Sequence, residues 1–195
     1  MTIKYLLGKF TFLFLVLVLI ISCSQNTEFT VDELSWIDVY KENDVLIFKN
    51  LISKELDTLF IVKKEVYHPD YDWFRHSEYI PHTAHLFYEN KKYKKLDHPA
   101  ELLEIYKRKP DKEARPLIKY LGSTFFTEEF TLVFSEVTLE TIQKSFDEVY
   151  TFRNAKQKNH RKGQDANPQV LFWDKEYGII KYVTYEGDIW ERVNW

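Results

Sequence analysis

The chain has 195 residues with a formal net charge of −3 at pH 7, and 45% of its residues are apolar. A mildly acidic chain lacks the basic surface with which proteins displace counterions from nucleic acid, so we expect no nucleic-acid partner. Its single cysteine excludes an intramolecular disulfide, and its length fits one folded domain.

The N-terminal segment is typical of a secretory signal peptide. Two lysines precede an apolar stretch over residues 10–21, and Ser22 and Cys23 follow it directly. The stretch is about 12 residues long, whereas a transmembrane helix needs roughly 20. Ser22-Cys23 resembles a bacterial lipobox, at which the cysteine thiol is acylated and the chain is cut before it. The sequence therefore predicts a signal peptide over 1–22 and lipid attachment at Cys23.

Cys23 and the residues that follow the predicted cleavage site indicate how the protein is attached to the membrane. Two or three acyl chains anchor a protein firmly, so we expect a diacylated or triacylated lipoprotein. Residues 23–32 are mostly polar and predict a lipidated tether, with a single β-rich domain over 33–195. Ser24 stands where many inner-membrane lipoproteins carry aspartate, and only Glu28 supplies acid near the acylated end. We therefore expect the outer membrane, with the periplasmic side favoured over the cell surface.

Three short apolar runs predict strands in the first half of the domain. They cover residues 44–49, 57–65 and 83–89, and each is bounded by polar residues. Residues 50–55 predict a hairpin connection between the first two.

The middle of the chain predicts one or two short helices. Apolar residues over 99–109 approximate helical spacing, Pro99 suits a first helical position, and Pro110 ends the segment. Residues 116–121 predict one more helical turn before Gly122.

The last third returns to strands. Phe130, Leu132 and Phe134 recur with a period of two, and Gly187 marks a turn near the end of the chain. Short connections between successive strands favour antiparallel neighbours. The expected fold is β-rich α+β, an antiparallel meander that can curl into a half-barrel. Its further strands are predicted at 137–142, 147–153, 170–174, 178–185 and 188–193.

Both ends of the folded region resemble a group of uncharacterised lipoproteins from the Bacteroidetes. The resemblance covers residues 36–48 and 57–62 at one end, and 146–152, 177–182 and 187–190 at the other. It implies the compartment and a type of strand packing, and it carries no catalytic residue.

A cluster of histidines raises the question of a metal site. His82 and His85 could join His76, or Asp70 and Asp72, around zinc, which needs three or four converging ligands. Because His82 and His85 are three apart in a predicted strand, their side chains are expected to diverge. We therefore interpret the histidines as exposed loop residues and predict no metal and no cofactor.

Aromatic residues make up 17% of the chain and allow two interpretations. Sheet packing is favoured for most of them, with Trp173 and Trp190 at core positions. A surface for a carbohydrate or hydrophobic ligand is the alternative, with Trp73 and Tyr71 in a predicted loop as the candidate contacts.

A long polar segment over 154–169 predicts a solvated hairpin loop. Lys158, Arg161 and Lys162 in this segment could contact an anionic lipid head group or a partner protein.

No recognisable catalytic motif is present. The five glycines are too sparse for a phosphate-binding loop, and no Gly-x-Ser-x-Gly sequence occurs. The sequence therefore predicts a membrane-anchored binding or interaction module of the cell envelope. A structural or assembly accessory of a membrane complex is the alternative, and an envelope hydrolase is a weaker one.

Overall fold

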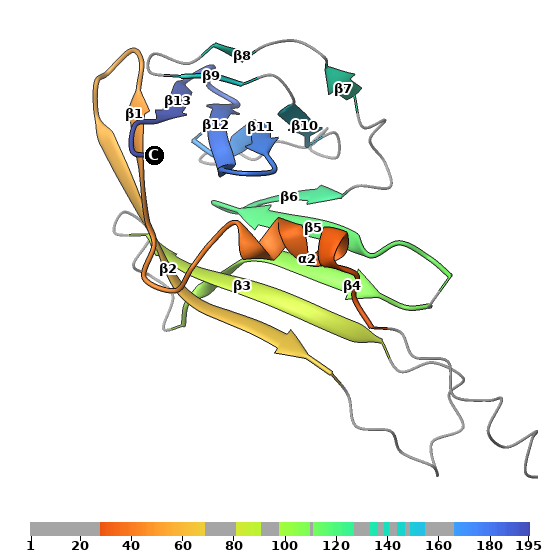
Figure 1. Ribbon diagram of the computed structural model, residues 1–195. Coiled ribbons are helices and arrows are strands. Elements are labelled where there is room, and N and C mark those ends of the chain that lie inside the picture. Colours follow the sequence, from red (N-terminus) through yellow and green to blue (C-terminus); the bar gives the residue numbers. More distant parts are fainter. Residues whose placement is uncertain are drawn as a thin grey trace, which may run out of the picture.

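The predicted β-rich α+β fold is confirmed by the computed structural model (Figure 1). The structure describes residues 28–68, 81–90, 98–109, 111–126, 133–135, 139–140, 144–146, 149–154 and 166–195. Within these ranges it contains a single short helix, α2, and two antiparallel sheets.

The main sheet joins two meanders through the first and last strands of the domain, because β1 pairs antiparallel with β13. The sheet curls into a half-barrel, with β2 to β5 on one side and β10 to β13 on the other (Figure 1). Its eleven strands lie in the order β6 (Ser123–Phe126), β5 (Arg115–Tyr120), β4 (Ala100–Lys107), β3 (His82–Asn90), β2 (Leu56–Tyr67), β1 (Val45–Asn50), β13 (Ile189–Arg192), β12 (Gly178–Thr184), β11 (Pro168–Asp174), β10 (Val149–Arg153) and β7 (Val133–Ser135).

A second, two-stranded sheet pairs β8 (Leu139–Glu140) with β9 (Ser145–Phe146). These short strands lie between β7 and β10 in the sequence. Phe146 of β9 is buried, and Tyr177 packs against it.

Helix α2 (Val31–Asp38) begins with a capping box. The Thr30 hydroxyl accepts from the Glu33 N–H, and the Glu33 carboxylate accepts from the Thr30 N–H at 2.7 Å. This reciprocal pair satisfies two donors that a helix start otherwise leaves without partners. Val31 and Asp32, which the sequence analysis assigned to the tether, therefore belong to the first turn of the helix.

The helix packs on the inner face of the curled sheet and contacts both of its halves. Trp36 lies against Tyr150 and Trp173 of the second half, with ring centroids 4.9 and 5.8 Å apart. Asp38 pairs with Lys64 of β2 at 3.0 Å. Burial of these large side chains in one cluster joins the two halves into a single core.

The two helices predicted in the middle of the chain are wrong. Residues 99–109 contain strand β4, and residues 116–121 contain most of strand β5. A β-bulge in β4 explains the first error: Leu86 of β3 lies opposite Leu103 while Phe87 lies opposite Glu101, so Leu102 is an extra residue. The insertion interrupts the period of two and leaves an apolar spacing that imitates a helix.

The other predicted strands agree with the structure where it describes them. Residues 44–49, 57–65 and 83–89 correspond to β1, β2 and β3, and the hairpin between β1 and β2 is confirmed. The last two predicted strands correspond to β12 and β13, joined by a turn in which Gly187 has φ +89°.

Three further predictions fall partly outside the described residues, and a fourth lies wholly within them. The runs 130–135, 137–142 and 147–153 include β7, β8 and β10, and 170–174 lies within β11. In the described part of the chain, no helix has the length and apolar character needed to cross a membrane.

Candidate functional site

The bulge in β4 places two glutamates on the outer face of the sheet, which is the face directed away from α2. In a regular strand, Glu101 and Glu104 would point to opposite faces because they are three residues apart. The extra residue Leu102 reverses this relation, and both carboxylates reach the same side chain, Lys119 of β5. We call His85, Glu101, Glu104 and Lys119 the outer-face network.

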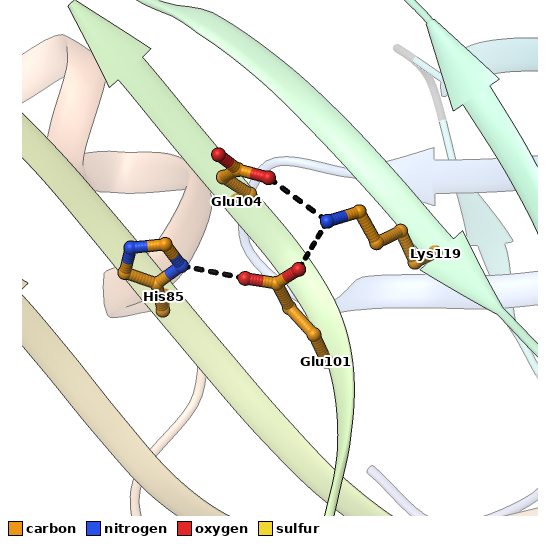
Figure 2. A network of polar contacts seen from close by, with 4 residues as sticks. All are labelled: His85, Glu101, Glu104 and Lys119. Carbon is orange, nitrogen blue, oxygen red and sulfur yellow. Dashed lines mark hydrogen bonds and ion pairs between the residues drawn. The ribbon is translucent and has the colours of Figure 1, made fainter.

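The network spans three neighbouring strands (Figure 2). The Glu101 carboxylate lies between two partners, since one oxygen is 2.5 Å from Nδ1 of His85 and the other accepts from Nζ of Lys119. Nζ of Lys119 also donates to Glu104 at 2.9 Å. The side chains are partly buried, with 19% of Glu101 and 36% of Lys119 exposed. Such partial desolvation makes charge-assisted hydrogen bonds stronger than those in open solvent.

The contacts in the network shift two pKa values. Burial raises the pKa of Glu101, but hydrogen bonds from Lys119 and His85 outweigh this effect and hold it below its ordinary value. Burial lowers the pKa of Lys119, but hydrogen bonds to Glu101 and Glu104 outweigh this effect and hold it above its ordinary value. Both residues are therefore fixed more firmly in their charged forms.

These directions decide what the network can do chemically. A general acid or base works best when its pKa lies near the operating pH, which requires a raised glutamate pKa or a lowered lysine pKa. Glu101 and Lys119 are shifted the other way. The network is therefore better suited to recognising a partner through fixed charges than to transferring protons.

A row of side chains that includes two exposed tyrosines lies beside the network on the same face. Tyr67 of β2, Thr83 of β3, Tyr106 of β4 and Arg115 of β5 lie opposite one another in the strand register. Tyr67 is 59% exposed and Tyr106 is 39% exposed. This row and the outer-face network together form a surface that we call the outer face of β2–β5.

The inner face is filled by the protein's own side chains. Trp173, Tyr40, Tyr120 and Phe48 are among the largest fully buried residues. They occupy the space between the sheet and α2, where a carrier protein would hold a ligand.

A buried polar cluster lies within this core. Asn90 donates to Asp57 at 2.9 Å, and the Tyr182 hydroxyl lies 3.4 Å from the other oxygen of Asp57. The adjacent Tyr120 hydroxyl is fully buried. Burial, together with the nearby Tyr182 and Asp57, raises the pKa of Tyr120 well above its ordinary value. This cluster is closed off from solvent and is part of the packing.

The two histidines considered for a metal site point in opposite directions. His82 is buried on the inner face with Nδ1 3.0 Å from Nδ1 of His68, whereas His85 belongs to the outer-face network. Their predicted divergence is confirmed, although His82 is a buried strand residue and not an exposed loop residue. His76, Asp70 and Asp72 lie outside the described residues. Among the residues that the structure describes, no group of three or more potential metal ligands occurs.

The other predicted site residues lie outside the described ranges. They are Cys23, Tyr71, Trp73, Lys158, Arg161 and Lys162. The core positions predicted for Trp173 and Trp190 are confirmed, since these residues are 0% and 6% exposed.

Sequence reasoning missed the outer-face network. Because residues 99–109 were predicted to form a helix, nothing indicated that Glu101 and Glu104 would lie close to Lys119. The overlooked signal was the alternation of Pro116, Ile118 and Tyr120, whose side chains are buried in β5.

No protein-family model matches the chain, and no significant similarity to a curated protein or to a solved structure was found.

Proposed function

We propose that the protein is a lipoprotein, anchored through Cys23 on the periplasmic side of the outer membrane, that binds an envelope protein through the outer face of β2–β5. The observation that carries this proposal is the exposure of Tyr67 and Tyr106 beside an ordered charged network. Aromatic side chains with fixed polar neighbours are typical of the residues that contribute most to protein interfaces.

Two other functions receive less support. Carriage of a hydrophobic ligand needs an interior space, and the inner face is packed with aromatic side chains. An envelope hydrolase would find its best candidate group in the contact between Glu101 and His85, but the lowered pKa of Glu101 opposes a role as proton donor or acceptor near neutral pH. A purely structural accessory would use the same outer face and would differ only in the permanence of its complex.

The proposed anchor is tested by changing Cys23→Ser in the full-length chain. We expect the wild-type protein to sediment with outer membranes and the variant to be released into the soluble envelope fraction, because the acyl chains supply the attachment. Equal membrane association of both proteins would contradict the lipid anchor.

The proposed binding surface is tested by site-specific photo-crosslinking in intact cells. We expect a photoreactive residue at position 106 to give a discrete crosslinked adduct, and the same residue at the exposed position 176, in the turn between β11 and β12, to give none. The charge reversal Lys119→Glu should weaken the adduct at position 106, because it places three carboxylates together. An adduct that is equally strong at both positions, or unaffected by Lys119→Glu, would rule out this surface.

A further inference from the structure

Three aromatic rings meet at steep angles near the end of the chain. They are Phe146 of β9, Tyr177 in the turn between β11 and β12, and Trp195. Their centroids are 5.8 Å apart for Phe146 and Tyr177, 5.1 Å for Phe146 and Trp195, and 5.7 Å for Tyr177 and Trp195. The corresponding interplanar angles are 73°, 53° and 88°, so the rings form three walls of a box. We call these three residues the aromatic cage.

The aromatic cage holds an ammonium group of the protein itself. Nζ of Lys144 lies 3.3 Å from the ring centroid of Tyr177, 5.5 Å from that of Phe146 and 5.8 Å from that of Trp195. A cation within about 6 Å of an aromatic face is attracted by the negative charge of the π system. Lys144 therefore has favourable contacts with all three walls.

Two of the walls are held in place independently of Lys144. Arg192 donates to the backbone oxygen of Tyr177 at 2.6 Å and to that of Asn194 at 2.7 Å. The Asn194 side chain accepts from the Ile47 N–H of β1 at 2.7 Å, which fixes the segment that carries Trp195. Such preorganisation lowers the cost of binding, because the walls need not be ordered by the ligand.

The cage combines a buried wall with an exposed one. Phe146 is 3% exposed, whereas Trp195 is 41% exposed, so solutes have access on the Trp195 side. Boxes of aromatic rings are the usual means by which proteins recognise alkylated ammonium groups.

We propose that Phe146, Tyr177 and Trp195 form a binding site for an alkylammonium group, and that Lys144 is a built-in occupant that competes with this ligand. The proposal is independent of the lipid anchor and of the outer face of β2–β5. Its ligand class is a cationic group with an apolar surface, as carried by choline or by a choline head group. Because Lys144 is covalently attached, its high local concentration weakens binding of the external ligand until it is displaced.

The test uses the full-length chain in detergent and calorimetric titration with choline. We expect Lys144→Ala to bind choline about tenfold more tightly than the wild type, because the variant has no competing ammonium group. The neutral isostere 3,3-dimethyl-1-butanol should bind more weakly than choline to the same variant. The double variant Lys144→Ala/Tyr177→Leu should lose choline binding, because Tyr177 supplies the closest wall.

A second measurement keeps the proposal testable if Lys144→Ala folds poorly. In the wild type, choline should speed acetylation of Lys144, measured by mass spectrometry, while the neutral isostere leaves the rate unchanged. Titration of vesicles that contain phosphatidylcholine, compared with free choline, distinguishes a lipid head group from a soluble ligand. Failure of choline to bind Lys144→Ala better than its neutral isostere would overturn the proposal, as would an unchanged acetylation rate in the wild type.

Discussion

Gly178 begins strand β12 at a point where both the backbone and the packing require glycine. Its φ is +73°, a region that other residues adopt only with strain. A Cβ atom at this position would lie 2.1 Å from the Tyr40 hydroxyl oxygen, which accepts from the Ile179 N–H at 2.6 Å. The buried Tyr40 ring can therefore occupy its position only because Gly178 has no side chain.

We expect Gly178→Ala to lower the free energy of unfolding by about 3 kcal/mol, from backbone strain and from displacement of Tyr40. Gly187→Ala is the matched control, because Gly187 also has a positive φ but has open space around it. The control should cost only about 1 kcal/mol. Urea denaturation measures both variants, and equal losses would show that Tyr40 does not restrict Gly178.

At the scale of elements, Glu33 connects the start of α2 to the sheet. Its carboxylate accepts from Lys107 of β4 at 2.8 Å and from the Ala114 N–H at 2.7 Å. Both side chains of the ion pair are nearly buried, with 10% of Glu33 and 5% of Lys107 exposed. Removal of one partner would leave the other charge buried and uncompensated.

We therefore expect Glu33→Ala to destabilise the protein by about 3 kcal/mol, with the exposed Asp32→Asn as a near-neutral control.

The stability that Glu33 contributes depends on pH. Burial raises the pKa of Glu33, but hydrogen bonds from Lys107, Thr30 and Ala114 outweigh it and hold the pKa below 4.5. Its contribution is thus present above pH 4.5 and is lost as the pH falls through the lowered value. A wild type and a Glu33→Gln variant with the same acid dependence of stability would contradict this assignment.

Secondary-structure elements with a regular apolar pattern are predicted well from the sequence. The run 44–49 forms a strand without a register shift, and its apolar pattern identified β1. Strand β4 was missed because its bulge changes the spacing of apolar side chains, and a bulge depends on pairing with a neighbouring strand. The capping box of Thr30 and Glu33 was a local signal that could have located α2.

At the scale of the whole molecule, the fold brings together residues that are far apart in the sequence. For this reason, the outer-face network and the aromatic cage could not be predicted from the sequence alone. The outer-face network joins β3, β4 and β5, and the aromatic cage joins a short strand, a turn and the segment after β13. None of these residues lies in a motif with fixed spacing. Their chemistry follows from the register of the sheet.

The junction between β1 and β13 holds the two meanders together, so we expect the domain to unfold in one transition. Asn194 strengthens this junction, since its side chain bonds to the backbone of Val45 and Ile47. Asn194→Ala should lower the free energy of unfolding by about 1–2 kcal/mol, while the exposed Glu186→Ala should change it little. Hydrogen exchange should show the same loss in β3 and in β12. A loss confined to one half would mean that the meanders unfold separately.

The early start of α2 sets a limit on geometry if the proposed anchor is correct. Because the helix cap is Thr30 and the acylated residue is Cys23, the intervening chain can extend to no more than about 25 Å. The domain would then lie close to the lipid surface, at a distance no greater than roughly its own width. Its targets would be proteins embedded in, or lying against, the same leaflet.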